Sequence, residues 1–119
     1  MLVKYRDDYQ KTTMGLLSYL PDFHKMAHLK AEMQWYAEGT GREMYLWRNE
    51  QQQFTGVVGF EQENDFILIR LLALSPQERN DQTRKAILDA VAELFPDQKL
   101  MGTIATTPML MRWQNLDAR

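Results

Sequence analysis

The stretch from Phe66 to Phe95 carries the residue pattern best suited to hold a phosphate group. An apolar run, Phe66–Leu74, is followed by a break at Ser75-Pro76 and by a polar patch over residues 77–85. Apolar residues then return at the spacing of one helix face, so we expect a strand, a short loop and a helix. The N-terminus of such a helix offers unpaired backbone N–H groups and a partial positive charge. Because these features suit a phosphate or pyrophosphate, we expect an anion to bind where the loop meets the helix.

A second group of chemically active residues precedes this stretch. His24, His28 and Glu32 are spaced four residues apart, which would place them on one face of a helix. Two histidines at this spacing can bind zinc, but the chain has no His-Glu-x-x-His motif and no further histidine. Since a lone helix face rarely supplies a complete coordination sphere, we interpret the row as a solvated face. We expect no metal site.

Size and composition limit the possible partners. The chain has 119 residues, enough for one domain with a real core, and we expect a single domain over residues 1–119. The formal net charge of −2 gives no reason to expect nucleic acid or an anionic membrane as a partner. The absence of cysteine excludes disulfides and thiolate chemistry and fits a reducing cytosol. We expect no signal peptide, because the first six residues have no apolar h-region, and no apolar run approaches the ~20 residues of a membrane-spanning helix. We therefore expect a soluble, cytoplasmic protein.

Periodicity and turn residues predict an α/β (α+β) fold of order β-α-α-β-β-β-α-β-α. Strands are expected at residues 2–6, 44–48, 54–61, 66–74 and 100–105, and helices at 9–20, 22–37, 80–95 and 107–115. Asp22 is the expected cap of the second helix, whose apolar face would include Met26. Short polar connections favour an antiparallel meander for the three central strands. The helix at 80–95 is then a crossover that would place the last strand parallel to strand 66–74.

The start of the phosphate-binding stretch resembles a known motif. Residues 72–79, Leu-Ala-Leu-Ser-Pro-Gln-Glu-Arg, are similar to the Leu-x-Val-x-Pro-x-x-Arg lead into the acetyl-CoA loop of the GCN5-related N-acetyltransferase (GNAT) superfamily. In register with that loop are Arg79, Lys85, Ala86 and Ile87. Gln82 and Arg84 stand where the family has glycines. Short matches at residues 14–18, 46–47, 56–59 and 94–95 resemble the RibT-like members of bacterial riboflavin-biosynthesis operons.

The resemblance implies a fold, a cosubstrate and a reaction. It implies a GNAT-like mixed sheet that binds acetyl-CoA with its thioester between the strand that ends at Leu74 and the strand that begins at Leu100. In this interpretation, pantetheine pairs with the backbone of Leu72, Ala73 and Leu74. The pyrophosphate would lie against a loop made of Arg79, Asn80, Asp81, Gln82, Thr83, Arg84 and Lys85. The acceptor would be an unidentified small amine or protein amine, reached by direct transfer and linked to riboflavin biosynthesis.

The catalytic groups are less defined than the cofactor loop. Direct transfer needs a base for the acceptor and an acid, commonly a tyrosine of the last helix in this family, to reprotonate the thiolate. Residues 108–115 contain no tyrosine. The base has four candidates, each more simply interpreted as a surface charge: Glu61, Glu63, His28 and Glu32. We assign no catalytic residue, and water is an alternative to the tyrosine.

Two interpretations from other classes stay open. The changed loop glycines and the missing tyrosine also fit a catalytically degenerate CoA-binding or regulatory module, or an interaction domain that keeps only the fold. The aromatic residues Trp35, Tyr36, Tyr45 and Trp47 would be core, an acceptor pocket or a dimer face. The resemblance also implies a C-terminally truncated sheet, because family members have two more strands. The resulting edge would be exposed or completed by a second copy in a homodimer.

Overall fold

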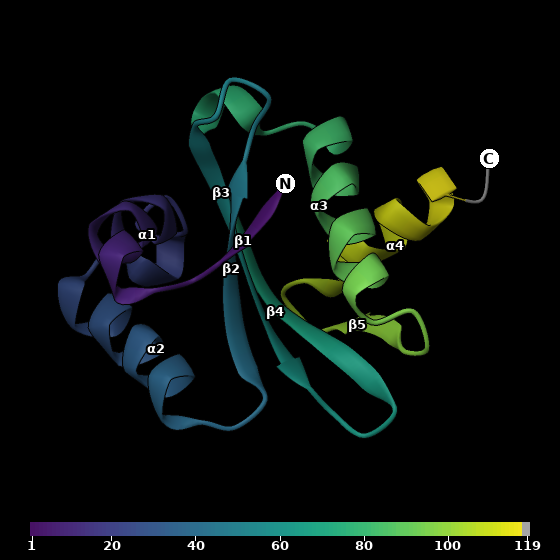
Figure 1. Ribbon diagram of the computed structural model, residues 1–119, viewed down its shortest axis with the longest axis horizontal. Helices are drawn as coiled ribbons and strands as arrows, with labels where there is room; N and C mark the ends of the chain where they lie inside the picture. Colours follow the sequence, from purple (N-terminus) through teal and green to yellow (C-terminus); the bar gives the residue numbers. More distant parts are fainter. Residues whose placement is uncertain (118–119) are drawn as a thin grey trace.

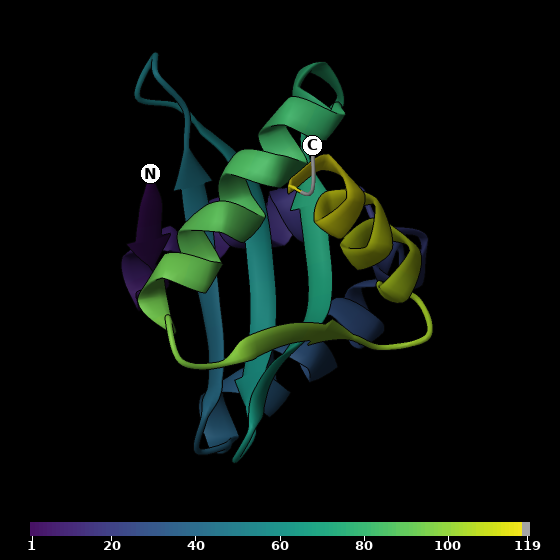
Figure 2. The ribbon, with the colours of Figure 1, turned by 90° about the vertical axis from the view of Figure 1, so that its right-hand side faces the viewer.

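A twisted five-stranded sheet forms the centre of residues 1–117, the part of the chain described by the computed structural model (Figures 1 and 2). The strands are Leu2–Lys4 (β1), Arg42–Arg48 (β2), Phe54–Gln62 (β3), Phe66–Leu74 (β4) and Lys99–Gly102 (β5). They lie in the order β1-β2-β3-β4-β5. Strands β1 to β4 pair antiparallel, and β5 pairs parallel with β4. Both the meander and the parallel last strand are confirmed.

Helices cover both faces of the sheet. They are Gln10–Leu17 (α1), Met26–Glu38 (α2), Asp81–Leu94 (α3) and Thr107–Asp117 (α4), with single 3-10 turns at Asp7–Tyr9, Pro21–Phe23 and Pro76–Glu78. Figure 1 shows α1 and α2 on one face and α3 and α4 on the other. The predicted order of elements is confirmed, and the fold class is α+β.

Several local predictions are wrong. The first strand ends at Lys4, not at residue 6, and the first helix spans Gln10–Leu17, not residues 9–20. The second helix begins at Met26, not at residue 22, because Pro21–Phe23 form a separate turn and Asp22 makes no capping hydrogen bond. Met26 is exposed, since it lies in the first turn of α2 before the helix reaches the sheet. The last strand ends at Gly102, not at residue 105.

Two cores lie on opposite faces of the sheet. The core beneath α3 and α4 contains Val58, Phe60, Ile67, Ile69, Leu74, Ile87, Leu88, Val91, Leu100 and Leu110. The core beneath α1 and α2 contains Leu16, Leu17, Leu29, Tyr36, Met44, Leu46, Val57, Leu71 and Ala73. Because alternate side chains of a strand point to opposite faces, the almost wholly apolar strand β4 supplies both cores.

A β-bulge changes this alternation in the middle of β4. The pairing of β3 with β4 is irregular between Gly59 and Phe60, and Arg70 is the extra residue of β4. Before Arg70, the odd-numbered residues Ile67 and Ile69 belong to the core beneath α3 and α4. After it, the odd-numbered residues Leu71 and Ala73 belong to the opposite core. The bulge therefore directs Arg70 and Leu71, which are consecutive, toward the same face.

Strands β4 and β5 separate at the same level. They pair only over Phe66–Ile69 and Lys99–Gly102. A Cβ on Gly102 would lie 2.8 Å from the Thr106 hydroxyl oxygen, so glycine permits the tight turn that takes the chain away from β4 into α4. The buried Thr106 hydroxyl then donates a 2.7 Å hydrogen bond to the carbonyl of Ile69. Beyond this bond, the β5-facing edge of β4 is open from Arg70 to Leu74.

Candidate functional site

The open edge of β4 leads into a cleft bounded by the first turns of α3 and by α4. A small cavity of about 100 Å³ is lined by Tyr19, Leu20, Leu72, Leu74, Arg79 and Arg84. A larger cavity of about 380 Å³ lies between α3 and α4, and its lining includes Arg84, Lys85, Pro108, Met109 and Trp113. Arg84 lines both cavities, so it lies between two parts of one cleft. Figure 2 shows α3 and α4 side by side in front of the sheet.

The N-terminus of α3 opens toward this cleft and is partly capped by its own residues. The Asn80 side chain accepts a 2.8 Å hydrogen bond from the backbone N–H of Thr83. Such a cap occupies one of the free N–H groups of a helix start. The N–H groups of Asp81 and Gln82 have no hydrogen-bond partner within residues 1–117. Two donors thus stay available to an anion.

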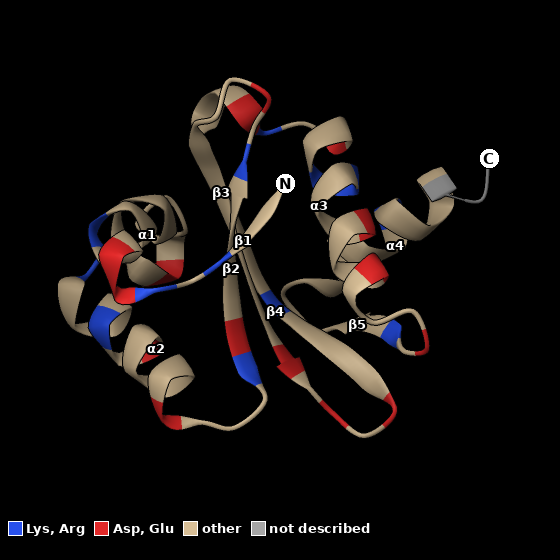
Figure 3. Ribbon diagram, viewed as in Figure 1, with Lys and Arg blue, Asp and Glu red and all other residues tan. Residues whose placement is uncertain are grey.

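Charges of both signs surround the helix start (Figure 3). Asp81 forms an ion pair with Arg112 of α4, and Glu78 accepts hydrogen bonds from Asn49 and from the Thr83 hydroxyl. Among the described residues, the side chain of Arg84 makes no hydrogen bond or ion pair. Arg84 is therefore the cation of this region best placed to bind an incoming anion.

The other two basic residues of the loop already have partners. Arg79 donates a 3.1 Å hydrogen bond to the carbonyl of Leu74, and its guanidinium lies 5.2 Å from the centre of the Tyr19 ring. Lys85 forms a 2.7 Å ion pair with Asp89, which also accepts a hydrogen bond from the Trp113 indole. Although burial raises it, these two hydrogen bonds hold the pKa of the Asp89 carboxyl below its ordinary value.

The predicted cofactor residues do not all lie at the cleft. Those that line it are Leu72, Leu74, Arg79, Asp81, Arg84 and Lys85, with Asn80 at the cap. The side chain of Ala73 is buried in the opposite core, so only its backbone belongs to the β4 edge. Gln82 and Thr83 line a separate cavity beside residues 47–52. Of the two residues in place of the family's glycines, only Arg84 enters the cleft.

A tyrosine that the sequence did not single out lies in the small cavity. Tyr19 follows α1, and its ring packs near Arg79 beside Leu72 and Leu74. No local pattern marks it, because its partners lie more than fifty positions further along the chain. As expected from the sequence, helix α4 contains no tyrosine.

The candidate bases occupy different environments. His28 and Glu63 are exposed, and Glu61 lies on β3. Glu32 pairs with Arg70, with 3.3 Å between the carboxylate oxygen and the guanidinium nitrogen. His24 precedes α2 and does not extend the row of His28 and Glu32. Within residues 1–117, no group of three or more histidine and acidic residues is arranged to hold a metal ion.

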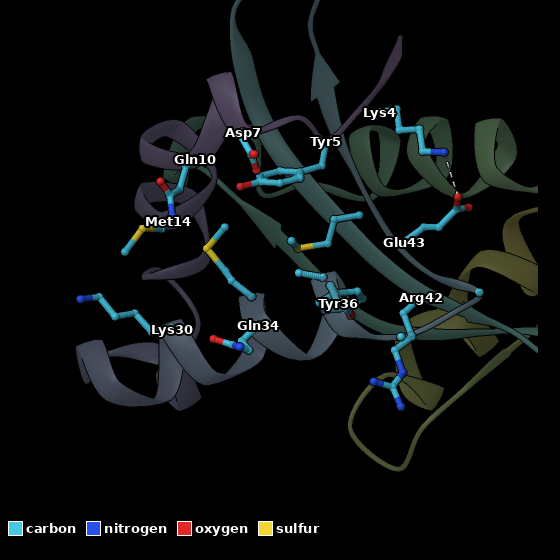
Figure 4. Close-up of a pocket in the computed structure, with 15 residues that line it drawn as sticks. Lys4, Tyr5, Asp7, Gln10, Met14, Lys30, Gln34, Tyr36, Arg42 and Glu43 are labelled. Atoms are coloured by element: carbon cyan, nitrogen blue, oxygen red, sulfur yellow. Dashed lines mark ion pairs between the residues drawn. The ribbon is translucent and has the colours of Figure 1, made fainter.

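A further cavity of about 650 Å³ lies on the other face, between α1, α2 and the edge of β2 (Figure 4). Its lining includes Tyr5, Met14, Met33, Tyr36 and Met44. By contrast, Tyr45 and Trp47 pack against the core beneath α3 and α4. The sheet therefore divides the aromatic group of the sequence into two sets, and only Trp35 and Tyr36 lie on the face of α2.

Several known proteins resemble this chain in sequence or in fold. No family model matches the chain. An uncharacterized N-acetyltransferase in the lysA 3′ region of Bacillus methanolicus is 28% identical over 102 residues, which cover 85% of this chain and 84% of that protein. Aminoglycoside N-acetyltransferase AAC(6′)-Iy, solved in complex with CoA, has a TM-score of 0.73 at 11% identity and covers 98% of this chain and 85% of its own.

A second solved structure gives the same result. Aminoglycoside 6′-N-acetyltransferase AAC(6′)-Ih from Acinetobacter baumannii has a TM-score of 0.69 at 13% identity and covers 98% of this chain and 87% of its own. The fold of this chain is therefore the GNAT fold, as the sequence predicted. No helix within residues 1–117 has the length and hydropathy to cross a bilayer.

Proposed function

We propose that residues 1–119 form one domain of the GNAT superfamily, which transfers the acetyl group of acetyl-CoA to an amine. The main support is the open edge of β4 beyond Ile69, which points toward a helix start that has two free N–H groups. The similarity to an N-acetyltransferase and to a CoA-bound acetyltransferase points in the same direction.

The residues of the cleft would contact successive parts of the acetyl-CoA molecule. The backbone of Leu72, Ala73 and Leu74 would pair with pantetheine, as an added strand pairs with a sheet edge. The phosphates would meet the free N–H groups of α3, Arg84 and, after rearrangement of their present contacts, Arg79, Asn80, Thr83 and Lys85. Bound acetyl-CoA supplies a thioester carbonyl that an amine can attack. The chain contributes position, since holding both reactants side by side lowers the entropic part of the barrier.

The acceptor and the assembly stay predictions. A small amine or a protein amine both fit an open cleft, and the link to riboflavin biosynthesis depends on the sequence resemblance alone. A homodimer is also proposed on one physical ground, because the edge strand β5 contains the exposed Met101 and is followed by the almost fully exposed Ile104.

The test begins with ligand binding. A ligand selective for the folded state adds about 2.7 kcal/mol to the free energy of unfolding at a concentration 100 times Kd. We expect acetyl-CoA to raise Tm by several degrees and an amine panel to release thiol from it. The absence of any Tm shift at millimolar acetyl-CoA would refute the proposal and leave an interaction domain.

A catalytically degenerate CoA-binding module is the second candidate. It is favoured by the position of Arg84 between the two cavities and by the lack of a tyrosine in α4. This module would give the same Tm shift with acetyl-CoA but no thiol release with any amine. Thermal and turnover measurements on one sample therefore separate the two candidates.

A further inference from the structure

A polar cluster lies at the level where β4 separates from β5, on the face covered by α2. Arg70, the bulge residue of β4, directly follows Ile69, the last residue of β4 paired with β5. Its guanidinium reaches Glu32 of α2 at 3.3 Å and lies 4.0 Å from the centre of the Trp35 ring. Arg42 lies at 4.0 Å from the same ring and donates a hydrogen bond to the Trp35 carbonyl. This network fixes the Glu32 carboxylate next to the opening.

The Glu32 carboxylate is held by Arg70 and is still partly exposed. Its side chain keeps 16% of its surface accessible, and that of Arg70 keeps 29%. One oxygen, Oε2, faces Arg70, whereas Oε1 has no partner among the described residues. The carboxylate can therefore accept a further hydrogen bond from a group that reaches its accessible part.

Two further groups of the cluster have unused hydrogen-bonding capacity. The Tyr36 hydroxyl and the Arg70 Nε are buried and make no hydrogen bond of good geometry within residues 1–117, although the two side chains lie close enough to interact with each other. Tyr36 is only 6% exposed and lies close enough to Arg70 for the guanidinium charge to oppose the rise in its pKa that burial causes. Buried polar groups are normally paired, and unpaired ones concentrate at sites that bind or react. The buried Tyr36 hydroxyl belongs to a third side chain beside the Glu32–Arg70 pair and lies in the same cluster.

We propose that Glu32 is the carboxylate that binds and deprotonates the acceptor amine, and that Arg70 is the positioning residue that holds it at the opening between β4 and β5. This inference rests on the proposed function and names its acceptor side. Because only 16% of the Glu32 side chain is accessible, we expect it to accept an unbranched primary amine more readily than a branched one. Glu61 is a poorer choice, because it lies on β3, one strand further from the opening.

The transfer step balances with these groups. The amine nitrogen gives one proton to the Glu32 carboxylate and forms the N–C bond to the acetyl carbon. The C–S bond breaks, and the sulfur leaves with the bonding electrons and takes one proton from water. Glu32 then returns its proton to solvent. The expected contribution of such a general base is roughly 10²–10⁴-fold in rate.

The experiment compares two substitutions of the same type on one helix. Glu32→Gln removes the proposed base, and Glu38→Gln changes an exposed glutamate whose side chain accepts a hydrogen bond from Gln34. Probes are n-butylamine, spermidine and the hindered tert-butylamine. We expect Glu32→Gln to lower kcat/KM for the two unhindered amines at least 100-fold and to abolish the additional Tm shift that they cause in the presence of CoA. Glu38→Gln should behave like the wild type, and tert-butylamine should be inert with all three proteins.

Arg70→Lys tests the positioning role. Lysine keeps the charge but loses the planar group that lies on Trp35, so we expect a higher KM for the amine with an unchanged Tm shift from CoA alone. The inference is overturned if Glu32→Gln keeps turnover within threefold, if it loses the CoA shift itself, or if the wild type shows no amine-dependent shift. A wild type without any CoA shift would instead refute the proposed function.

Discussion

Arg84 is the residue on which cofactor binding depends most directly. Its side chain lies between the two cavities of the cleft and has no hydrogen-bond or ion-pair partner in the described chain. We expect Arg84→Ala to weaken acetyl-CoA binding roughly 10- to 100-fold, because a hydrogen bond to a charged group contributes about 1.5–3 kcal/mol. Isothermal titration calorimetry measures the effect.

The matched control for Arg84 is in the same turn of α3. Gln82→Ala removes a side chain that faces the separate cavity beside residues 47–52, so binding should change less than twofold. If Arg84→Ala instead binds acetyl-CoA more tightly than the wild type, then the side chain obstructs the cleft and its role as a phosphate ligand is wrong.

Tyr36 makes stability depend on pH in the alkaline range. Burial raises the pKa of its hydroxyl above the ordinary value near 10. Above that pH, the unfolded chain loses a proton that the folded chain keeps, so ionisation favours unfolding. The contribution of Tyr36 is therefore complete below pH 10, and the free energy of unfolding falls by up to about 1.4 kcal/mol per pH unit above it. Urea unfolding of the wild type between pH 8 and pH 11 measures this slope.

Tyr36→Phe isolates that effect from other titrating groups. At pH 7 its stability should be close to that of the wild type, because the lost hydroxyl makes no hydrogen bond of good geometry among the described residues. Above pH 10 its stability should fall less steeply. Parallel curves for the two proteins would show that Tyr36 ionises in the folded state as readily as in the unfolded chain.

At the scale of elements, the close packing of α2 on the sheet depends on Gly59. A Cβ on this residue would overlap the Tyr36 hydroxyl and lie 2.8 Å from Cζ of its ring. We expect Gly59→Ala to destabilise the protein by roughly 1–3 kcal/mol, since the ring cannot move without disturbing the core beneath α2. Gly15→Ala is the control, because Gly15 lies in α1 with no atom near its would-be Cβ. It should gain about 0.5–1 kcal/mol in urea unfolding. Equal effects of the two changes would contradict this fit.

The elements that sequence periodicity predicts well are those with long, regular patterns. The apolar run of β4 and the amphipathic helix α3 are confirmed nearly to the residue, because burial alone determines them. The end of β5 was wrong because the turn at Gly102 depends on contact with Thr106, which periodicity does not contain. The bulge at Arg70 likewise depends on pairing with β3.

The candidate site was predictable only in part for the same reason. The loop motif identified Arg79, Arg84 and Lys85 together with the β4 edge, which are close in sequence. The motif could not show that Gln82 lines a different cavity, whereas Arg84 lines the cleft. Tyr19 and the Glu32–Arg70 pair join segments far apart in the chain, so no spacing rule could connect them.

At the scale of the whole molecule, the meander with α1 and α2 forms one region, and β5 with α4 forms another. Helices α1 and α2 pack on the meander. Strand β5 pairs with it over only four residue pairs, and the Thr106–Ile69 bond and the core residues Leu100 and Leu110 add further contacts. The cleft lies between these regions. A ligand that pairs with β4 and touches α3 and α4 would therefore connect the less attached part of the molecule to the meander.

This arrangement predicts where hydrogen exchange will respond to acetyl-CoA. The ligand should slow exchange at residues 70–74, at the first turn of α3 and at the start of α4, because it occupies free donors and ties these segments together. Peptides of α1 and α2 around the 650 Å³ cavity should not change. ADP, which lacks the pantetheine arm, should protect the start of α3 but not residues 70–74. Mass-spectrometric exchange with both ligands tests this, and protection by acetyl-CoA confined to α1 and α2 would mean that the cofactor binds on the opposite face of the sheet.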